Sequence, residues 1–370
     1  MVCPQGTEAR GAPPPYNSEQ FCRRPDGSRH GPAAGWYPND KPEYRGTFAD
    51  DVEDGHWERW YESGGKELDA TYSKGQLNGH LTAWWENGNK RSEGNYVDGA
   101  EDGEVTDYYE NGKPESQRTY KKGQLNGKLT GWFENGQKRV EITLVDGVED
   151  GESIEYYEDG KPASKKQYKL GQYEGQVTDW YENGQKRFEG TFVAGAPNGE
   201  LREWYDNGKE RSVTHYVNGE EDGPFVQYYE NGNKQAVGAK KHGEPDGELR
   251  RYYENGKDEE LMNFVDGQLS GPYKRWFDNG QIAIDTVMKN GDPDGVRKTY
   301  WENGKPQSEA TFKEGKPEGL FVEWDEEGNK TREANFHDGE LDGKEVLYQK
   351  SGKVVRKWKK GELVGGKNGR

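Results

Sequence analysis

Histidines are the side chains of this 370-residue sequence best suited to acid–base or metal chemistry, but their spacing keeps them apart. His56 and His80 share one phase of the repeat described below, which would hold them roughly 10 Å apart, a long reach for one metal ion. No nucleophile elbow, P-loop, dinucleotide fingerprint or His-Glu-x-x-His motif occurs. We therefore expect no catalytic residue, no metal and no cofactor, and we predict that the protein is not an enzyme. The histidines, which we interpret as surface residues, are His30, His56, His80, His215, His242 and His337.

Carboxylates are the other abundant reactive group, with 69 Asp and Glu residues. Acidic glycine turns such as 98–102 and 146–150 could hold Ca²⁺ weakly, but they lack the tight spacing of calcium β-rolls. Solvated turns are the simpler interpretation. A paired-carboxylate site of the glycosidase kind would need a deep cleft, which a single-layer sheet seldom provides.

Aromatic rings form the most regular candidate binding feature, since the chain has 12 Trp and 23 Tyr. One ring recurs every 24 residues, and such a row could bind a partner protein or stack on sugars. The candidate binding row is Trp60, Trp84, Tyr108, Trp132, Tyr156, Trp180, Trp204, Tyr228, Tyr252, Trp276 and Tyr300.

The elements that position these rings follow from an uninterrupted glycine series with a spacing of 24 residues. We number each repeat from that glycine as position zero, so that the rings above lie at position five. Positions eight and nine are usually Asn-Gly, which predicts a two-residue type I′ hairpin turn. A second glycine segment closes each repeat and predicts a looser turn. The series is Gly31, Gly55, Gly79, Gly103, Gly127, Gly151, Gly175, Gly199, Gly223, Gly247, Gly271, Gly295, Gly319 and Gly343.

The predicted fold is therefore all-β: an elongated, single-layer antiparallel sheet of about fourteen stacked 24-residue hairpins, twisted or curved. The array is expected over residues 31–365, after an irregular leader at 1–30 and before a short tail at 366–370. Polar residues at Asp325 and Gln349, where earlier repeats have an aromatic ring, suggest a C-terminal cap.

The assumed turn also predicts the register, because positions that add up to seventeen would oppose each other across the hairpin. Position two, often aliphatic, should share a face with position six and oppose the small residues of position fifteen. Position five should oppose position twelve, which predicts four cation–π pairs. These pairs are Trp84 with Arg91, Trp132 with Arg139, Trp180 with Arg187, and Trp204 with Arg211.

The repeat at 223–246 departs from the pattern, because Lys240 replaces the usual aromatic residue of position seventeen. A binding notch and a weak joint or local slip in the array are both compatible with this change.

Net charge restricts the partners, since the chain carries -17 at pH 7. Such a surface repels phosphate, so we expect no nucleic-acid binding and no direct lipid binding. The one basic run, from Lys350 to Lys360 around Trp358, is interpreted as a solvated terminal strand, with contact to an acidic partner or a membrane surface as the alternative.

The residues from Trp180 to Gly190, followed by Gly195, resemble the second class of MORN repeat, as found in bacterial MORN-variant proteins, some of which are catalogued as antitoxins. The resemblance covers about 31–365. It implies a stack of hairpins and a binding scaffold, and it brings no catalytic residue with it.

The leader contains both cysteines, Cys3 and Cys22, and it looks like the mature start of exported bacterial proteins. A Cys3–Cys22 disulfide, two free thiols, and lipidation of Cys3 are all compatible with the sequence. We expect an exported protein, periplasmic, outer-membrane-anchored or extracellular, with a cytoplasmic location as the alternative.

Together these observations predict a non-catalytic scaffold that binds a partner protein, which is basic or associated with the cell envelope, through its aromatic and acidic surface. The alternatives are a cell-wall or glycan-binding module and an antitoxin-like neutraliser of a toxin. Self-association through the end strands is also compatible with the repeat.

Overall fold

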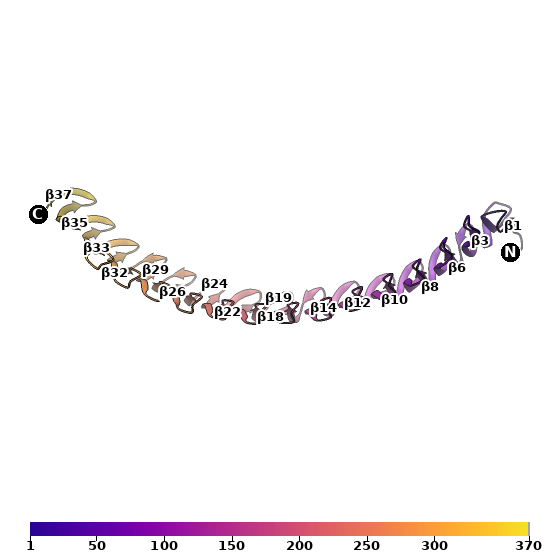
Figure 1. The fold of residues 1–370 in the computed structure, drawn as a ribbon, viewed down its shortest axis with the longest axis horizontal. Coiled ribbons are helices and arrows are strands. Elements are labelled where there is room, and N and C mark those ends of the chain that lie inside the picture. The colour runs from indigo at the N-terminus through magenta and orange to yellow at the C-terminus, as the bar shows by residue number, and fades with distance from the viewer. Residues whose placement is uncertain (369–370) are drawn as a thin grey trace. The chain divides into compact units, whose positions relative to one another are not determined.

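The computed structural model describes residues 1–368, and these residues form antiparallel strands and no helix. The chain divides into two units, Met1–Gly184 and Gln185–Arg370. Within each unit, successive hairpins lie side by side in chain order and form an open sheet (Figure 1). The predicted fold class, an all-β array of stacked 24-residue hairpins, is confirmed.

The first unit contains seventeen strands. They are β1 (Glu8–Gly11), β2 (Glu19–Arg23), β3 (Arg29–Trp36), β4 (Pro42–Ala49), β5 (Val52–Glu53), β6 (Gly55–Trp60), β7 (Lys66–Ser73), β8 (Gln76–Trp84), β9 (Lys90–Val97), β10 (Ala100–Tyr108), β11 (Pro114–Lys121), β12 (Gln124–Trp132), β13 (Lys138–Val145), β14 (Val148–Tyr156), β15 (Pro162–Lys169), β16 (Gln172–Tyr173) and β17 (Gly175–Trp180).

The second unit contains the remaining strands, of the same alternating lengths. They are β18 (Lys186–Val193), β19 (Ala196–Pro197), β20 (Gly199–Trp204), β21 (Glu210–Val217), β22 (Glu220–Tyr228), β23 (Lys234–Lys241), β24 (Glu244–Pro245), β25 (Gly247–Tyr252), β26 (Asp258–Val265), β27 (Gln268–Leu269), β28 (Gly271–Trp276), β29 (Ile282–Lys289), β30 (Asp292–Pro293), β31 (Gly295–Tyr300), β32 (Pro306–Lys313), β33 (Lys316–Trp324), β34 (Lys330–His337), β35 (Glu340–Gln349), β36 (Gly352–Lys359) and β37 (Glu362–Asn368).

The Asn-Gly segment makes a three-residue loop, so the predicted type I′ turn is wrong. Gly88 has φ of 88° and donates its N–H to the carbonyl of Trp85 at 2.9 Å, while Asn87 keeps an ordinary negative φ. The N–H of Trp85 then bonds the carbonyl of Asn89 at 2.8 Å. This pattern is typical of a β-turn followed by a left-handed glycine, a common hairpin alternative to type I′.

The closing segment makes the type I′ turn instead. Lys74 and Gly75 have φ of 52° and 81°, and the flanking Ser73 and Gln76 are paired directly. The two turns of each repeat are therefore exchanged relative to the prediction. Type I′ needs positive φ at both central residues, and here a Lys takes the first of them at some cost in backbone energy.

The longer loop changes the register only beside the turn. Positions zero to four oppose seventeen to thirteen as predicted, for example Leu81 opposite Gly94. At the loop, however, the register shifts by one and Trp84 opposes Lys90. Position twelve therefore has no direct partner across the hairpin.

This shift makes the predicted Trp–Arg pairs wrong where the register is described, because Trp132 opposes Lys138 and Trp204 opposes Glu210. In the hairpin of Trp84, Arg91 lies 5.8 Å from the ring centroid of Trp85, at position six. The expected pair of Trp180 with Arg187 spans the boundary between the units and stays a prediction.

Positions two and fifteen oppose each other as predicted, and much of the thin core lies between them. A Cβ added to Gly94 would stand 2.8 Å from Cγ2 of Val105 in the next hairpin. Trp57 is 2% exposed, and its ring lies where a Cβ on Gly46 would point. Where position fifteen is Gly or Ala, as at Gly46 and Gly94, the position-two side chain of the next hairpin packs over it.

The leader is more regular than its sequence indicates, because β1 pairs with β2, and β2 pairs with β3 at the start of the array. Cys3 and Cys22 are joined by a disulfide with their Cα atoms 5.6 Å apart, and Cys22 is fully buried. At the other end β37 continues to Asn368, past the expected boundary at 365. Residues 369–370 of the expected tail lie outside the described residues.

Candidate functional site

The second aromatic residue of each repeat, at position six, is used to tie hairpins together. The hydroxyl of Tyr109 donates to the carbonyl of Trp132 at 2.8 Å, and the indole N–H of Trp85 donates to the carbonyl of Tyr108 at 3.0 Å. Each bond reaches position five of the following hairpin. The same bond is made by Tyr37, Tyr61, Tyr157, Tyr205, Tyr229, Tyr253 and Trp301.

The Asn of position eight explains why Asn-Gly recurs without a type I′ turn. Oδ1 of Asn111 accepts the N–H of Lys113 at 2.9 Å, and its Nδ2 donates to the carbonyl of Glu134 in the next hairpin at 3.1 Å. The Lys113 ammonium adds a bond to the carbonyl of Asn135 at 2.7 Å. The side chain of one residue thus shapes its own loop and also links to the next one.

The acidic closing turns have a structural use as well. A carboxylate of Asp102 accepts the N–H of Lys122 in the next repeat at 3.2 Å, and Asp54 does the same for Lys74 at 3.2 Å. These N–H groups belong to the left-handed residues of the type I′ turns. Within residues 1–368 no group of three His, Cys, Asp or Glu side chains is placed to hold a metal ion.

The eleven candidate position-five rings all lie half-buried at the end of a hairpin's first strand. Charged side chains of the preceding hairpin contact five of them, which are Trp60, Trp84, Tyr108, Tyr156 and Trp204. Tyr156 donates to Glu141 at 2.6 Å, and Glu141 is paired with Lys138 at 2.8 Å. The Nζ atom of Lys66 lies 5.5 Å from the ring centroid of Trp84. These five rings are therefore in contact with the preceding hairpin and are not openly exposed.

Burial and charge change how these tyrosines ionise. Burial, followed by the hydrogen bond to Glu93, raises the pKa of Tyr108 to about 12. The bond to Lys90, followed by that to Tyr108, lowers the pKa of Glu93. At neutral pH each such ring is a neutral donor to an ionised carboxylate, which is a structural arrangement.

An apolar patch interrupts this charged face in the second unit. Val213 opposes Val226, and Val226 opposes Val237, so three valines form one cross-strand row. All three are half-buried and share a face with the position-five rings of Trp204 and Tyr228. We call these three valines the valine patch. Sequence reasoning missed it, although comparing positions three and fourteen between repeats would have found it.

The corresponding positions in the first unit are mostly polar, and its large apolar exception Ile154 lies between Glu141 and Lys165 instead of in an apolar row. Thr82, Thr106 and Thr130 occupy position three, and Glu93 and Glu141 occupy position fourteen. A β-sheet surface tolerates Thr and Val equally well, so sheet formation alone does not require three valines here.

Two arginines limit the valine patch at its ends. Arg202 opposes Val213, and Arg250 opposes Val237. Arg202 contacts Glu200 at 2.5 Å and Glu210 at 2.7 Å, and Arg250 contacts Glu248 and Asp258 at 3.3 and 3.4 Å. Because each arginine is paired with two carboxylates, both ends of the row carry net negative charge.

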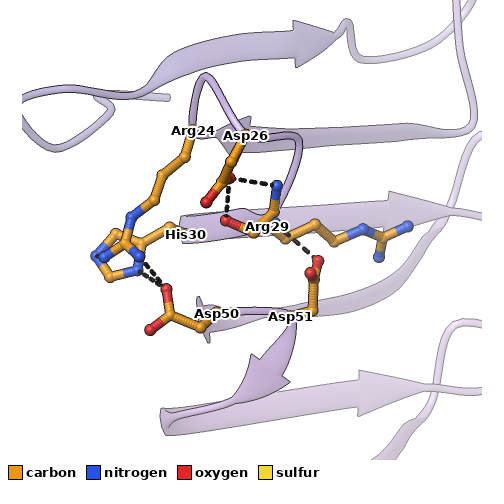
Figure 2. Close-up of polar contacts among 7 residues, drawn as sticks. Arg24, Asp26, Arg29, His30, Asp50 and Asp51 are labelled. Carbon is orange, nitrogen blue, oxygen red and sulfur yellow. Dashed lines mark hydrogen bonds and ion pairs between the residues drawn. The ribbon is translucent and has the colours of Figure 1, made fainter.

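A polar cluster at the start of the array joins the leader to the first repeat (Figure 2). Arg24 pairs with Asp50, and its NH2 lies 3.2 Å from Nε2 of His30. Nδ1 of His30 lies 3.4 Å from Oδ1 of Asp50 without hydrogen-bond geometry. The hydroxyl of Ser28 donates to the carboxylate of Asp26 at 2.6 Å. These contacts fix the leader on the turn between β4 and β5.

The irregular repeat keeps the normal register, since Lys240 opposes Gly223 like the aromatic residue it replaces. Its ammonium pairs with Glu221 and lies 6.0 Å from the ring centroid of Phe225. The local slip that the sequence allowed is therefore not found at Lys240.

The C-terminal repeats end the array with buried charge. Glu345 occupies position two, is 3% exposed, and accepts from Nε of Arg332 and Nε1 of Trp358, both at 2.9 Å. Asp325 replaces the position-six ring and accepts the N–H of Asn329 at 2.7 Å. Arg356 of the basic terminal run also lies 3.7 Å from Glu345, so part of that run pairs within the array.

Six segments of the chain match the MORN repeat variant, and their starts are separated by multiples of the 24-residue repeat. They cover less than half of the chain. The matched residues are 77–98, 101–122, 149–170, 173–194, 245–266 and 293–314. Comparison with curated proteins finds no match.

Solved structures of toxin complexes show only remote similarity. A TcdB2–TccC3 crystal structure matches with a TM-score of 0.18 and 12% identity over 90% of this chain and 19% of that one. The Photorhabdus luminescens Tc holotoxin pore matches with a TM-score of 0.17 and 10% identity over 93% and 21%. The chain spans about a fifth of those chains, and we carry nothing over from them. No helix suited to crossing a membrane is found in residues 1–368.

Proposed function

We propose that the chain is a non-catalytic repeat scaffold that binds a partner protein. The valine patch is the observation that supports this best. Most of the recurring aromatic and asparagine side chains bond a neighbouring hairpin. The three valines instead lie half-buried on the sheet face opposite the core of positions two and fifteen. An apolar row on a charged surface is typical of a protein-binding site.

The surroundings of the patch favour a partner with an apolar centre and a basic rim. Each flanking arginine is outnumbered by its two carboxylates, and the whole chain carries -17. Association should therefore be faster at low ionic strength and slower in high salt. A toxin with these features would make the chain an antitoxin-like neutraliser, which is one form of the same proposal.

The test compares capture of the partner by the full chain and by a variant of the valine patch. In the variant, the three valines are replaced by the residues that other repeats have at the same positions. Val213→Glu, Val226→Thr and Val237→Glu together copy the pattern of positions fourteen and three, so the variant is expected to fold. We expect the wild type to capture one protein at low salt and to release it at high salt. The triple variant should fail to capture that protein. Thr106→Val in the first unit is the matched control.

Two results would count against the proposal. A protein captured equally well by the triple variant would show that the patch is not the binding site. Salt-independent recovery of polysaccharide or cell-wall material would support the glycan-binding alternative, although that mode requires the charged side chains to move off the rings. Running the capture on envelope and soluble fractions also tests the proposed export, for which the buried Cys3–Cys22 disulfide is the supporting observation.

A further inference from the structure

Three neighbouring departures from the repeat coincide in the second unit. Position six is Phe277, which has no polar tip to bond the next hairpin. Position twelve is Ala283, where four other repeats have arginine. Position two of the following repeat is Arg297, and position two is charged elsewhere only at Glu345 within residues 1–368.

These departures lie around a groove of about 780 Å³. In the repeat of Trp85, the side chain of Arg91 covers the position-six ring at 5.8 Å. Ala283 is too short to cover Phe277 in this way, so the ring faces the groove. The walls include Phe277, Ala283, Ile284, Arg297, Trp301 and Gln307.

The groove contains polar groups that the fold does not use. Arg297 is half-buried, and neither it nor Gln307 has an ion-pair or hydrogen-bond partner among residues 1–368. Half-burial of a guanidinium without a partner is costly, and in a chain of -17 an unneutralised cation is unusual. Glu302 and Glu326 lie at the rim, where their carboxylates can accept hydrogen bonds.

The aromatic walls are held in place. Nε1 of Trp301 donates to the carbonyl of Trp324 at 3.1 Å, which fixes the indole against the groove. The positive charge of Arg297 also affects the pKa of the nearby Tyr273. Burial and the bond to Glu260 raise the pKa of Tyr273 to about 12, while Arg275 and Arg297 act in the opposite direction. Both arginines therefore face the same region of this sheet surface.

We propose that this groove binds a carboxylated sugar, a hexuronate residue, with its carboxylate on Arg297 and its ring against Phe277 and Trp301. A guanidinium binds a carboxylate with two parallel hydrogen bonds. The free amide of Gln307 and the carboxylates of Glu302 and Glu326 supply partners for ring hydroxyls. This second set of polar groups distinguishes a sugar acid from an aromatic acid. A long polyuronate would be repelled by the rest of the chain, so a single or terminal residue fits.

The experiment is a titration of the full chain with D-glucuronate, glucose and benzoate. Binding is measured by calorimetry and by ligand-observed NMR. We expect glucuronate to bind at least about tenfold more tightly than glucose, which lacks the carboxylate, and than benzoate, which lacks the hydroxyls. Arg297→Leu restores the usual position-two residue, and Ala283→Arg fills the groove as Arg91 does. Each should weaken glucuronate binding by at least about tenfold.

Ala163→Arg is the control, because Ala163 occupies position twelve in the first unit and should leave binding unchanged. Benzoate that binds as tightly as glucuronate would overturn the sugar assignment. No binding by glucuronate, or binding unaffected by both groove variants, would overturn the site. Each of these outcomes is separate from the valine-patch test, because the two sites use different residues and different probes.

Discussion

Gly46 shows how little room the packed face leaves at position fifteen. A Cβ placed on Gly46 would lie 2.2 Å from Cδ2 and 2.3 Å from Cε2 of Trp57. Trp57 cannot easily retreat, because it is 2% exposed and its Nε1 donates to the carbonyl of Thr47 at 3.1 Å. Its ring also stacks on Tyr44 at 5.6 Å and meets Phe48 edge-on at 5.0 Å. Gly46→Ala must therefore move the indole.

The cost can be worked from these contacts. Displacing a packed side chain costs about 1–3 kcal/mol, and loss of the indole hydrogen bond costs about 1 kcal/mol. Ala also lowers the conformational entropy of the unfolded chain, which stabilises the folded state by about 0.4–1 kcal/mol. We expect Gly46→Ala to destabilise the first repeats by about 2–3 kcal/mol. The same substitution at Gly190 meets the flexible Leu201 side chain at 3.3 Å and the ring tip of Phe188 at 3.4 Å, and it should change stability by less than about 1 kcal/mol.

Hydrogen exchange measured strand by strand is the suitable assay, because repeat arrays can open locally. Amides of β4 and β6 should exchange about 30- to 150-fold faster in Gly46→Ala. Those around β18 should change little in Gly190→Ala. Unchanged exchange in β4 and β6 would refute the packing argument, and equal effects at both glycines would refute the distinction between a rigid indole and a flexible leucine.

Two further predictions concern the tyrosines of the array. Tyr109→Phe removes the hydroxyl bonded to the carbonyl of Trp132 at 2.8 Å and should cost about 1 kcal/mol by urea denaturation, with the fold kept because Phe133 already occupies the same position. An unchanged urea midpoint would contradict the bond's role. Because the pKa of Tyr108 is raised in the folded state from 10.0 to about 12, its contribution is complete below pH 10 and is lost between about pH 10 and 12. Tyr108→Phe should reduce the alkaline loss of stability over that range, and an identical pH profile would argue against it.

The hairpin stack was predictable because its main signals are strictly periodic. The glycine series fixed the repeat length, and the alternation of strand residues placed position two opposite position fifteen, as in Leu81 and Gly94. The turn assignment failed because Asn87 has two possible uses. An Asn before Gly fits a type I′ turn, but here its side chain bonds the next hairpin, a contact between repeats that local sequence does not reveal.

The candidate sites were harder to predict, because each depends on neighbours from different repeats. The position-five rings are regular in sequence, yet their exposure depends on side chains such as Lys66 in the preceding hairpin. Ala283 alone is uninformative, since Ala163 occupies the same position without a comparable neighbour. Only the arrangement of Ala283 beside Phe277 and Arg297 defines the groove.

The bonds between hairpins give each unit a direction. Beside the Asn-Gly loops the position-six and position-eight side chains donate to the following hairpin, as from Tyr37 to the carbonyl of Trp60 and from Asn111 to the carbonyl of Glu134. Along the type I′ turns the donors point back, as from the N–H of Gly75 to the carbonyl of Glu53. A hairpin inserted in frame between two others therefore finds matching partners on both sides, whereas an inverted one finds none. We therefore expect that whole repeats can be added or removed without a change of fold, so that the length of the array and its fold are separate properties.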